Sequence, residues 1–398
     1  MAESMSNRHF TMDLLPFTKP TITQDEQNAV RAVLASGWLA SGPQTAAFEQ
    51  ALAERIGGGV RVLAFNSGTS ALEAALLAAD IGPGDEVIVP AMSFTASANV
   101  VLRTGARPRF ADVDPVSRNL TAELALRALS PRTRAIMPVH FAGRPAALDA
   151  LYELACAHGL TVIEDAAQAI GSRYLDREIG ASGNPVCFSF HPNKNITTIE
   201  GGALALADQQ MARRLQRIRF HGIEKDAEGN VNVSEWGGKM NMPDVNAALG
   251  LAQLRKLDAF NVRRAQLARR YLALLRPSPL LGLPKDAPGH SWHMFCICVD
   301  FAALGSTRAA FLCALRERGI AAGIHYPAIH LFGLYRRFGY APGDFPNAER
   351  IGEQTLTLPL FPGMTDADVE RVCVALNELI GDPAAKPALA IQPGGVYG

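Results

Sequence analysis

The chain has 398 residues, of which 48% are hydrophobic and 19% are charged, which is ordinary for a folded globular protein with room for two domains. Lysine plus arginine and aspartate plus glutamate both number 38, so the zero net charge does not indicate nucleic acid or an anionic membrane as a partner. No apolar run reaches the roughly 18 residues of a membrane span, and the N-terminal stretch MAESMSNRHFTMDLLPF lacks the apolar segment of a signal peptide. We therefore expect a cytoplasmic protein.

Apolar strands and amphipathic helices alternate through the first two thirds of the chain. Thr23 to Glu26 has capping-box spacing, which predicts the start of the first helix. Further helices are predicted at 70–81, after 90, from about 121 and at 147–159; strands are predicted at 61–65, 86–90, 107–113, 135–139, 161–165, 186–190 and 203–207. This order predicts an α/β fold with a mostly parallel sheet and helices on both faces.

The alternation of strands and helices ends with two helices at about 243–276. An apolar stretch at 291–300, a helix at 307–318, the stretch GIAAGIHYP and a closing helix near 365–380 are typical of a smaller α+β domain. We expect an N-terminal arm over 1–22, a large α/β domain over 23–276 and a small α+β domain over 277–381. The remainder, 382–398, is rich in Pro, Gly and Ala and is expected to be a flexible tail.

Six cysteines are scattered along the chain, and only Cys296 and Cys298 stand close together in sequence. A zinc site would need a second Cys or His pair at ligand spacing, which the sequence lacks. We expect buried, reduced thiols and no metal.

The stretch FNSGTSALEAALLAA joins a predicted strand to a predicted helix. Free backbone N–H groups of a first helical turn, with a glycine that permits close approach, form an anion cradle around Gly68 and Thr69. The stretch is neither a Walker A loop nor GxGxxG. A plain helix cap by Ser67 or Thr69 accounts for the same residues, so both interpretations stay open.

Asp165, in TVIEDAAQAIGS, lies where a predicted strand meets a loop, the end at which open α/β sheets bind ligands. A carboxylate there can hydrogen-bond a cationic ring nitrogen and hold its proton. Gln168 follows three residues later and can face the same way. Alternatively, Asp165 caps a following helix.

Lys194 lies in the small polar turn of FSFHPNKNITTIEGG, directly after the strand predicted at 186–190. A lysine in a turn is usually solvated, but this one falls on the same sheet edge as Gly68 and Asp165. A phosphate cradle, an acid and an amine together fit pyridoxal 5′-phosphate, with the lysine as its Schiff-base partner.

Ordered motifs along the chain resemble those of the nucleotide-sugar aminotransferases called the DegT/DnrJ/EryC1/StrS family. They are SGWLASGP, NSGTSALEAAL, GPGDEVIVPAMSF, IEDAAQAIGS, FSFHPNKNITTIEGGAL, RFHG and NMPDVNAALGLAQL. The resemblance covers about residues 14 to 380 and implies a fold-type-I, aspartate-aminotransferase-like enzyme that acts as an obligate homodimer with shared active sites. GWLASGP, PVHFAG, SFHPNKNIT and LPLFPGMTDAD look closest to the UDP-4-amino-4-deoxy-L-arabinose–oxoglutarate aminotransferases.

The resemblance implies roles around the cofactor ring. Lys194 matches the Schiff-base lysine and Asp165 the acid that binds the pyridine nitrogen. Gln168 matches a residue on the side of the ring hydroxyl. Phe94 matches the aromatic that stacks on the ring, although ordinary core packing would also explain a phenylalanine there.

The resemblance also implies contacts to the cofactor phosphate. Gly68 and Thr69 match backbone contacts, and Ser189 matches a hydroxyl contact. Asn241 matches an amide that reaches the phosphate from the neighbouring subunit.

Three residues are candidates for substrate contact. His191 either contacts substrate or packs beside Lys194. His325 and Tyr326 either meet the sugar nucleotide or form a buried strand end. The carrier diphosphate needs cations, and Arg219 and Lys239 are among the candidates.

The implied reaction moves the amino group of glutamate to a nucleotide-linked keto sugar, with a 4-keto sugar preferred, and leaves 2-oxoglutarate. Its product would serve the synthesis of a cell-surface polysaccharide or lipid A. Dehydratase relatives replace the Schiff-base lysine with histidine, so the retained Lys194 favours amine transfer. The alternatives are a fold-type-I lyase or aldolase, or a non-catalytic pyridoxal phosphate-binding regulator.

Overall fold

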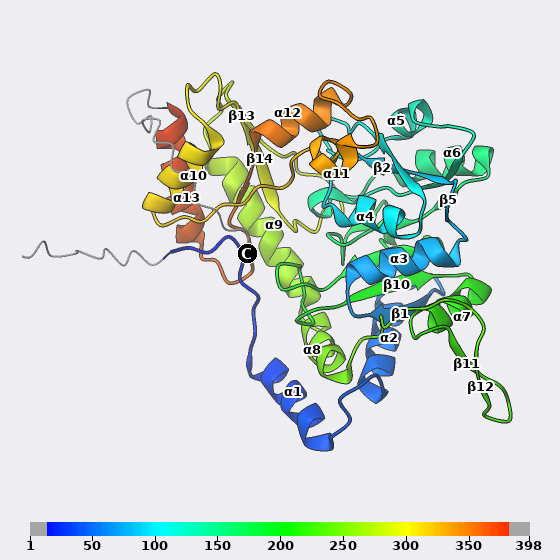
Figure 1. Ribbon diagram of the computed structural model, residues 1–398. Coiled ribbons are helices and arrows are strands. Elements are labelled where there is room, and N and C mark those ends of the chain that lie inside the picture. Colours follow the sequence, from blue (N-terminus) through cyan, green and yellow to red (C-terminus); the bar gives the residue numbers. More distant parts are fainter. Residues whose placement is uncertain (1–13, 382–398) are drawn as a thin grey trace, which may run out of the picture.

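The computed structural model describes residues 14–381 (Figure 1). The segments 1–13 and 382–398, which contain the start of the expected arm and the whole expected tail, lie outside the described residues.

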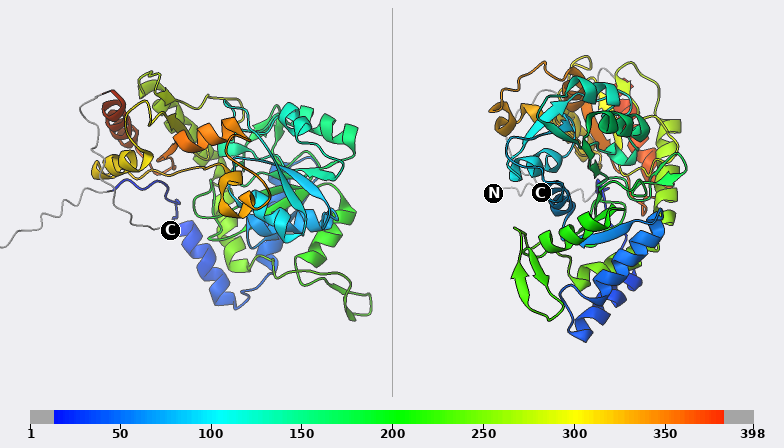
Figure 2. Two further views of the ribbon diagram at one scale, coloured as in Figure 1. Left: turned by 45° about the horizontal axis from the view of Figure 1, so that its top comes forward. Right: turned by 90° about the vertical axis from the view of Figure 1, so that its right-hand side faces the viewer.

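A central sheet runs in the order β3-β2-β4-β5/β6-β9-β10-β1 (Figures 1 and 2). Ile163 alone separates β5 from β6, and a parallel bridge between Val139 and Asp165 joins the two halves of the sheet. The strands are β1 (Arg61–Phe65), β2 (Glu86–Pro90), β3 (Arg107–Ala111), β4 (Thr133–Ile136), β5 (Thr161–Val162), β6 (Glu164–Asp165), β9 (Val186–Ser189) and β10 (Gly202–Leu206). The predicted mostly parallel sheet is confirmed, since only β10 runs antiparallel to its neighbours.

Strand β10 is antiparallel because of the segment that precedes it. Parallel neighbours need a crossover connection, usually a helix. Residues 190–201 contain no helix, so the chain turns back and pairs with β9 antiparallel. Lys194 lies in this reversal, at the carboxyl end of β9.

Helices cover both faces of the sheet, as predicted. Successive strand residues alternate between two cores: Val62 and Ala64 of β1 face one, and Leu63 and Phe65 face the other. The core of Leu63 and Phe65 contains α3 (Gly68–Ala78), α4 (Ala96–Arg103) and α7 (Gln209–Ile218). The core of Val62 and Ala64 contains α2 (Pro43–Ile56), α5 (Ala122–Arg127), α6 (Leu148–His158) and α8 (Asp244–Leu254).

A third core lies at the C-terminal end of the described chain (Figure 1). There the antiparallel strands β13 (Leu281–Gly282), β14 (Phe295–Val299) and β15 (Thr355–Leu358) pack with α10 (Arg308–Glu317) and α13 (Asp366–Gly381). The long helix α9 (Leu257–Leu274) contributes Leu267 and Tyr271 to this core, and Leu15 of the expected arm pairs with Ile320. The division of the chain at residue 276 remains our proposal.

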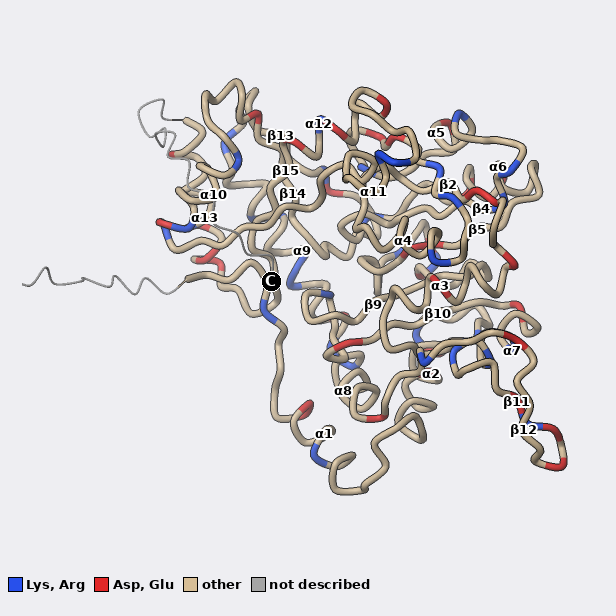
Figure 3. Tube along the Cα trace, viewed as in Figure 1, with Lys and Arg blue, Asp and Glu red and all other residues tan. Residues whose placement is uncertain are grey.

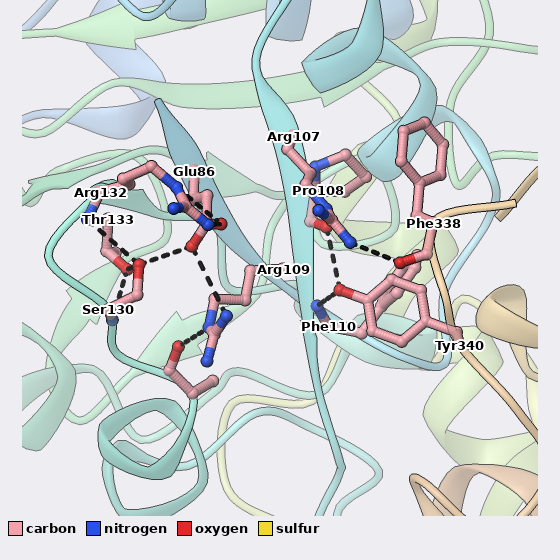
Figure 4. Close-up of polar contacts among 11 residues, drawn as sticks. Glu86, Arg107, Pro108, Arg109, Phe110, Ser130, Arg132, Thr133, Phe338 and Tyr340 are labelled. Atoms are coloured by element: carbon pink, nitrogen blue, oxygen red, sulfur yellow. Dashed lines mark hydrogen bonds and ion pairs between the residues drawn. The ribbon is translucent and has the colours of Figure 1, made fainter. Parts of the chain in front are cut away.

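A segment from this C-terminal region closes the free edge of β3 (Figure 4). The Tyr340 hydroxyl accepts the backbone N–H of Phe110 at 3.3 Å and donates to the carbonyl of Pro108 at 3.1 Å. Arg107 donates to the carbonyl of Phe338. The edge therefore offers fewer unpaired backbone groups to another chain. Nearby, Glu86 at the start of β2 accepts from Arg132 at 2.6 Å.

The remaining elements are short or peripheral. The predicted capping box is confirmed at Thr23, where α1 (Gln24–Ser36) begins. The hairpin β11 (Ile223–Lys225) and β12 (Val231–Val233) projects from the body at the lower right of Figure 1. The others are α11 (Gly333–Arg336), α12 (Pro346–Gln354), 3-10 turns at Phe141–Gly143 and Ile329–Leu331, and the hairpin β7 (Arg173–Tyr174) and β8 (Arg177–Glu178).

Acidic and basic residues are interspersed over the described chain (Figure 3). No helix within residues 14–381 is long and apolar enough to cross a membrane. All six cysteines are free, as expected. Cys298 is only partly buried, and the prediction of burial is wrong for the exposed Cys156 and Cys313. These two lie on solvent-facing sides of α6 and α10.

Candidate active site

A cavity of about 270 Å³ opens at the carboxyl ends of β1, β6 and β9. It brings together every residue predicted to bind the cofactor or the substrate except Asn241, whereas the candidate cations Arg219 and Lys239 do not line it. Its lining consists of Ser67, Gly68, Thr69, Leu72, Phe94, Ala96, Asp165, Ala167, Gln168, Ser189, His191, Asn193, Lys194, Glu200, His325 and Tyr326.

The first wall of the cavity is the N-terminus of α3. Ser67 caps this helix by accepting the backbone N–H of Ser70 at 3.0 Å, so the cap interpretation is confirmed for Ser67. The N–H groups of Gly68 and Thr69, in contrast, have no acceptor among the described residues. The cap and the anion cradle are therefore compatible, because they use different N–H groups.

Two glycines let this turn sit directly on the sheet. A Cβ on Gly68 would lie 2.8 Å from the Cβ of Ser189, and a Cβ on Gly202 would lie 2.5 Å from the backbone nitrogen of Gly68. Both distances are well inside van der Waals contact. The glycines therefore permit α3 to begin against the ends of β9 and β10.

Asp165 forms the second wall and is 4% exposed. Its Oδ1 accepts the backbone N–H of Ala167 at 3.1 Å, and its Oδ2 accepts the hydroxyl of Ser97 at 2.7 Å. The alternative that Asp165 caps a helix is wrong, because residues 166–171 form turns and a strand follows. Its carboxylate is left to face the cavity.

Lys194 lies opposite, in the turn after β9, where its backbone N–H donates to the carbonyl of His191 at 2.8 Å. Burial lowers the pKa of its amine from 10.5 to about 8, against the opposing effect of the Asp165 charge. A useful share of this amine is therefore neutral, and nucleophilic, near neutral pH.

Gln168 connects the sheet edge to the C-terminal region. Its Oε1 accepts the backbone N–H of Ala142 at 2.7 Å, and its Nε2 donates to the Tyr326 hydroxyl at 3.3 Å. Burial raises the pKa of Tyr326, so this phenol stays protonated. Phe94 is 56% exposed, with its ring 6.0 Å from that of Tyr326, so the core-packing alternative for Phe94 is wrong.

The two candidate histidines differ. His325 stacks on Phe17 at 5.1 Å and its Nδ1 lies 2.9 Å from the Thr357 hydroxyl. Burial, assisted by the charge of Lys194, lowers the pKa of His325 to about 4, so this ring is neutral. His191 is exposed, and its Nε2 lies 3.8 Å from Glu200 at the cavity mouth. Neither His325 nor Tyr326 lies in a strand and both are only partly buried, so the alternative of a buried strand end is wrong.

Asn241 is the predicted site residue that does not line this cavity. Its side chain donates to Ser41 at 2.5 Å and accepts from Lys239 at 2.7 Å. Arg219 is a poor candidate for the diphosphate, because it donates to Glu49 and, at 2.8 Å, to the carbonyl of Ala64.

Sequence reasoning missed several residues of the site. Glu200 lines the cavity, but no role was predicted for it although it stands in the stretch FSFHPNKNITTIEGG. Asn195 anchors the Lys194 turn by donating to the carbonyl of Ser291 at 3.0 Å and bonding Nδ1 of His293 at 3.1 Å. Ser97 carried no sequence signal, because its partner Asp165 lies 68 residues away in the chain.

Known proteins resemble this chain over most of its length. The DegT/DnrJ/EryC1/StrS aminotransferase family matches residues 20–377. DesV of S. venezuelae is 36% identical, with a TM-score of 0.84 over 90% of this chain and 95% of DesV. The aminotransferase PseC of Helicobacter pylori, involved in pseudoaminic acid biosynthesis, is 28% identical, with a TM-score of 0.87 over 92% of this chain and 99% of PseC.

The putative sugar aminotransferase Spr1654 of Streptococcus pneumoniae, solved in its PMP-form, is 29% identical, with a TM-score of 0.87 over 94% of this chain and 99% of Spr1654. A PLP-form of Spr1654 is similarly related, at 29% identity. The chain therefore belongs to the DegT/DnrJ/EryC1/StrS aminotransferase family, as a fold-type-I transaminase that uses pyridoxal 5′-phosphate.

Proposed function

We propose that this enzyme transfers the amino group of glutamate to a nucleotide-linked keto sugar, preferentially a 4-keto sugar, for the synthesis of a cell-surface polysaccharide or lipid A. The observation that carries the proposal is the cavity that Lys194 shares with Asp165 and the N-terminus of α3, where burial lowers the pKa of the Lys194 amine. Bound pyridoxal phosphate supplies the electron sink that makes acidic the proton on the carbon bonded to the substrate nitrogen.

The cavity walls suit this cofactor. The free N–H groups of Gly68 and Thr69 would hold the phosphate, with the Ser189 hydroxyl beside them. Asp165 would keep the ring nitrogen protonated, and Phe94 would cover a face of the ring. Lys194 would bond the aldehyde and, once released, carry a proton to and from the reacting carbon.

The charge of the cavity supports a site completed by a second copy of the chain. The ligands bring a phosphate, a dicarboxylic donor and a sugar-linked diphosphate, yet Lys194 is the only lysine or arginine among the described lining residues. Exposed apolar side chains, including Trp38, Leu39 and Trp236, are 59%, 47% and 63% exposed and offer a surface for a partner. We therefore propose a homodimer in which Asn241 serves the neighbouring site.

The reaction is tested by incubating the purified enzyme with ¹⁵N-glutamate and a panel of nucleotide-linked keto sugars, and following the products by mass. We expect one sugar nucleotide to gain ¹⁵N while 2-oxoglutarate accumulates, and we expect Lys194→Ala to abolish both. Elimination or carbon–carbon cleavage without ¹⁵N transfer would favour the lyase or aldolase alternative. Binding without turnover of any substrate would favour the regulator.

The shared site is tested by co-expressing Lys194→Ala and Asn241→Asp chains carrying different affinity tags. If each site combines Lys194 of one chain with Asn241 of the other, every mixed dimer has one intact site, so activity returns although each variant alone is inactive. If each site belongs to one chain, the mixed dimer has two defective sites. Mixed dimers without activity would therefore refute the sharing.

A further inference from the structure

Two serines form a chain of hydroxyl groups behind Asp165. The Ser97 hydroxyl lies 2.7 Å from Oδ2 of Asp165 and 3.0 Å from the hydroxyl of Ser93. Ser93 and Ser97 are 2% and 0% exposed, so water does not replace these contacts. Ser97 does not line the cavity, and it would reach the cofactor only through Asp165.

The direction of these hydrogen bonds follows from the number of protons. An ionised carboxylate only accepts, so the single hydroxyl proton of Ser97 goes to Asp165, the nearest and only charged acceptor. The carbonyl of Phe94, at 3.2 Å, is the weaker competitor. Ser93 then donates to the lone pair of Ser97, which keeps the Ser97 hydroxyl turned toward the carboxylate.

The two carboxylate oxygens therefore have one fixed donor each. Oδ1 accepts from the backbone of Ala167 and Oδ2 accepts from Ser97, so the plane of the carboxylate is set from both sides. A carboxylate held in a fixed orientation is the partner that a protonated ring nitrogen requires.

We infer that Ser97, turned by Ser93, is a positioning residue that keeps the Asp165 carboxylate aimed at the ring nitrogen of the cofactor. This inference rests on the proposed role of Asp165. Without the Ser97 hydroxyl, the carboxylate can rotate away from the ring nitrogen. The ring nitrogen then holds its proton less well, which weakens the electron sink.

The test is a ¹⁵N NMR spectrum of holoenzyme reconstituted with pyridoxal phosphate labelled at the ring nitrogen, because the shift of this nucleus reports its protonation. In Ser97→Ala we expect the unprotonated fraction at pH 7.5 to rise about tenfold, the effect of one lost hydrogen bond to a charged group. Ser93→Ala should shift the signal in the same direction by less. The dissociation constant of the cofactor should also rise about tenfold in Ser97→Ala.

The matched control is Ser172→Ala. Ser172 is also 0% exposed and bonds the carbonyl of Gly143 at 2.8 Å and the Ser291 hydroxyl at 2.7 Å, without contacting a carboxylate. Its removal should leave the ring-nitrogen signal unchanged. An unchanged signal in Ser97→Ala would overturn the inference, and if that variant does not fold, an unchanged signal in Ser93→Ala would do the same. No sugar substrate is used, so the result is separate from the identity of the amine acceptor.

Discussion

Replacing Asp165 with asparagine should have opposite effects on two steps of this enzyme. The Asp165 charge raises the pKa of the Lys194 amine, although burial holds that pKa at about 8 overall. Removing the charge should lower the pKa further and leave more of the amine neutral. The same change removes the group that would hold the ring proton, so turnover should fall even as the amine becomes more reactive.

The magnitude follows from the pKa of Lys194. At pH 7 and a pKa of about 8, about one amine in ten is neutral, whereas at 10.5 about one in three thousand would be. A neighbouring opposite charge shifts a pKa by roughly one unit or more. Asp165→Asn should therefore leave about half of the Lys194 amines neutral at pH 7 and raise their reaction rate about fivefold.

The assay is reductive alkylation of the cofactor-free enzyme with a small aldehyde between pH 6 and 10, measured at Lys194 by peptide mass spectrometry. The alkylation rate of the exposed Lys285, measured on the same chain, corrects for the dependence of the reagent itself on pH. We expect the Lys194 rate to reach half its maximum near pH 8 in the wild type and near pH 7 in Asp165→Asn. A wild-type midpoint near 10.5, or an upward shift in the variant, would refute the reasoning.

Three further predictions concern stability, each measured by urea unfolding of the cofactor-free protein. Gly202→Ala should destabilise the fold by about 3 kcal/mol and weaken cofactor binding, because its Cβ would lie 2.5 Å from the Gly68 nitrogen; Gly333→Ala, which meets open space, is the matched control. Tyr340→Phe should cost about 1 kcal/mol, because it removes the hydroxyl that satisfies Phe110 and Pro108 on the edge of β3; an unchanged midpoint would show that water replaces it. The free energy of unfolding should rise with pH between about 8 and 10.5, because the unfolded chain keeps the Lys194 proton longer than the folded chain does, and Lys194→Met should flatten that rise.

The strands of the sheet were predictable because their local pattern is strong. The runs at 61–65 and 86–90 coincide with β1 and β2, and 161–165 covers β5 and β6. Gly68, Asp165 and Lys194 follow or end β1, β6 and β9. Because parallel strands end at one edge of a sheet, the sequence predicted that these three residues lie close together. The hairpin of β11 and β12 was missed because its strands are three residues long and contain no buried residue, so they lack the alternation of a buried face.

Features of the site that depend on long-range contacts were not predictable. Ser97 lies 68 residues from Asp165 in the sequence, so no local pattern connects them. The sequence made Arg219 a reasonable candidate to bind the diphosphate. In the fold, however, Glu49 and the carbonyl of Ala64 accept its hydrogen bonds. Phenylalanine is usually a core residue, so the sequence did not predict that Phe94 is exposed. Its exposure is explained by the cavity that opens beside it.

The position of Lys194 follows from the reversal of the sheet. If β9 and β10 were parallel, a crossover helix would lie between them, and the lysine would leave the sheet edge with it. The antiparallel return instead keeps residues 190–201 above the carboxyl end of β9 and brings Gly202 beneath the turn at Ser67 and Gly68. The absence of a side chain at Gly202 lets the helix terminus settle beside the lysine. One short reversal thus brings the amine and the free N–H groups of α3 into the same cavity.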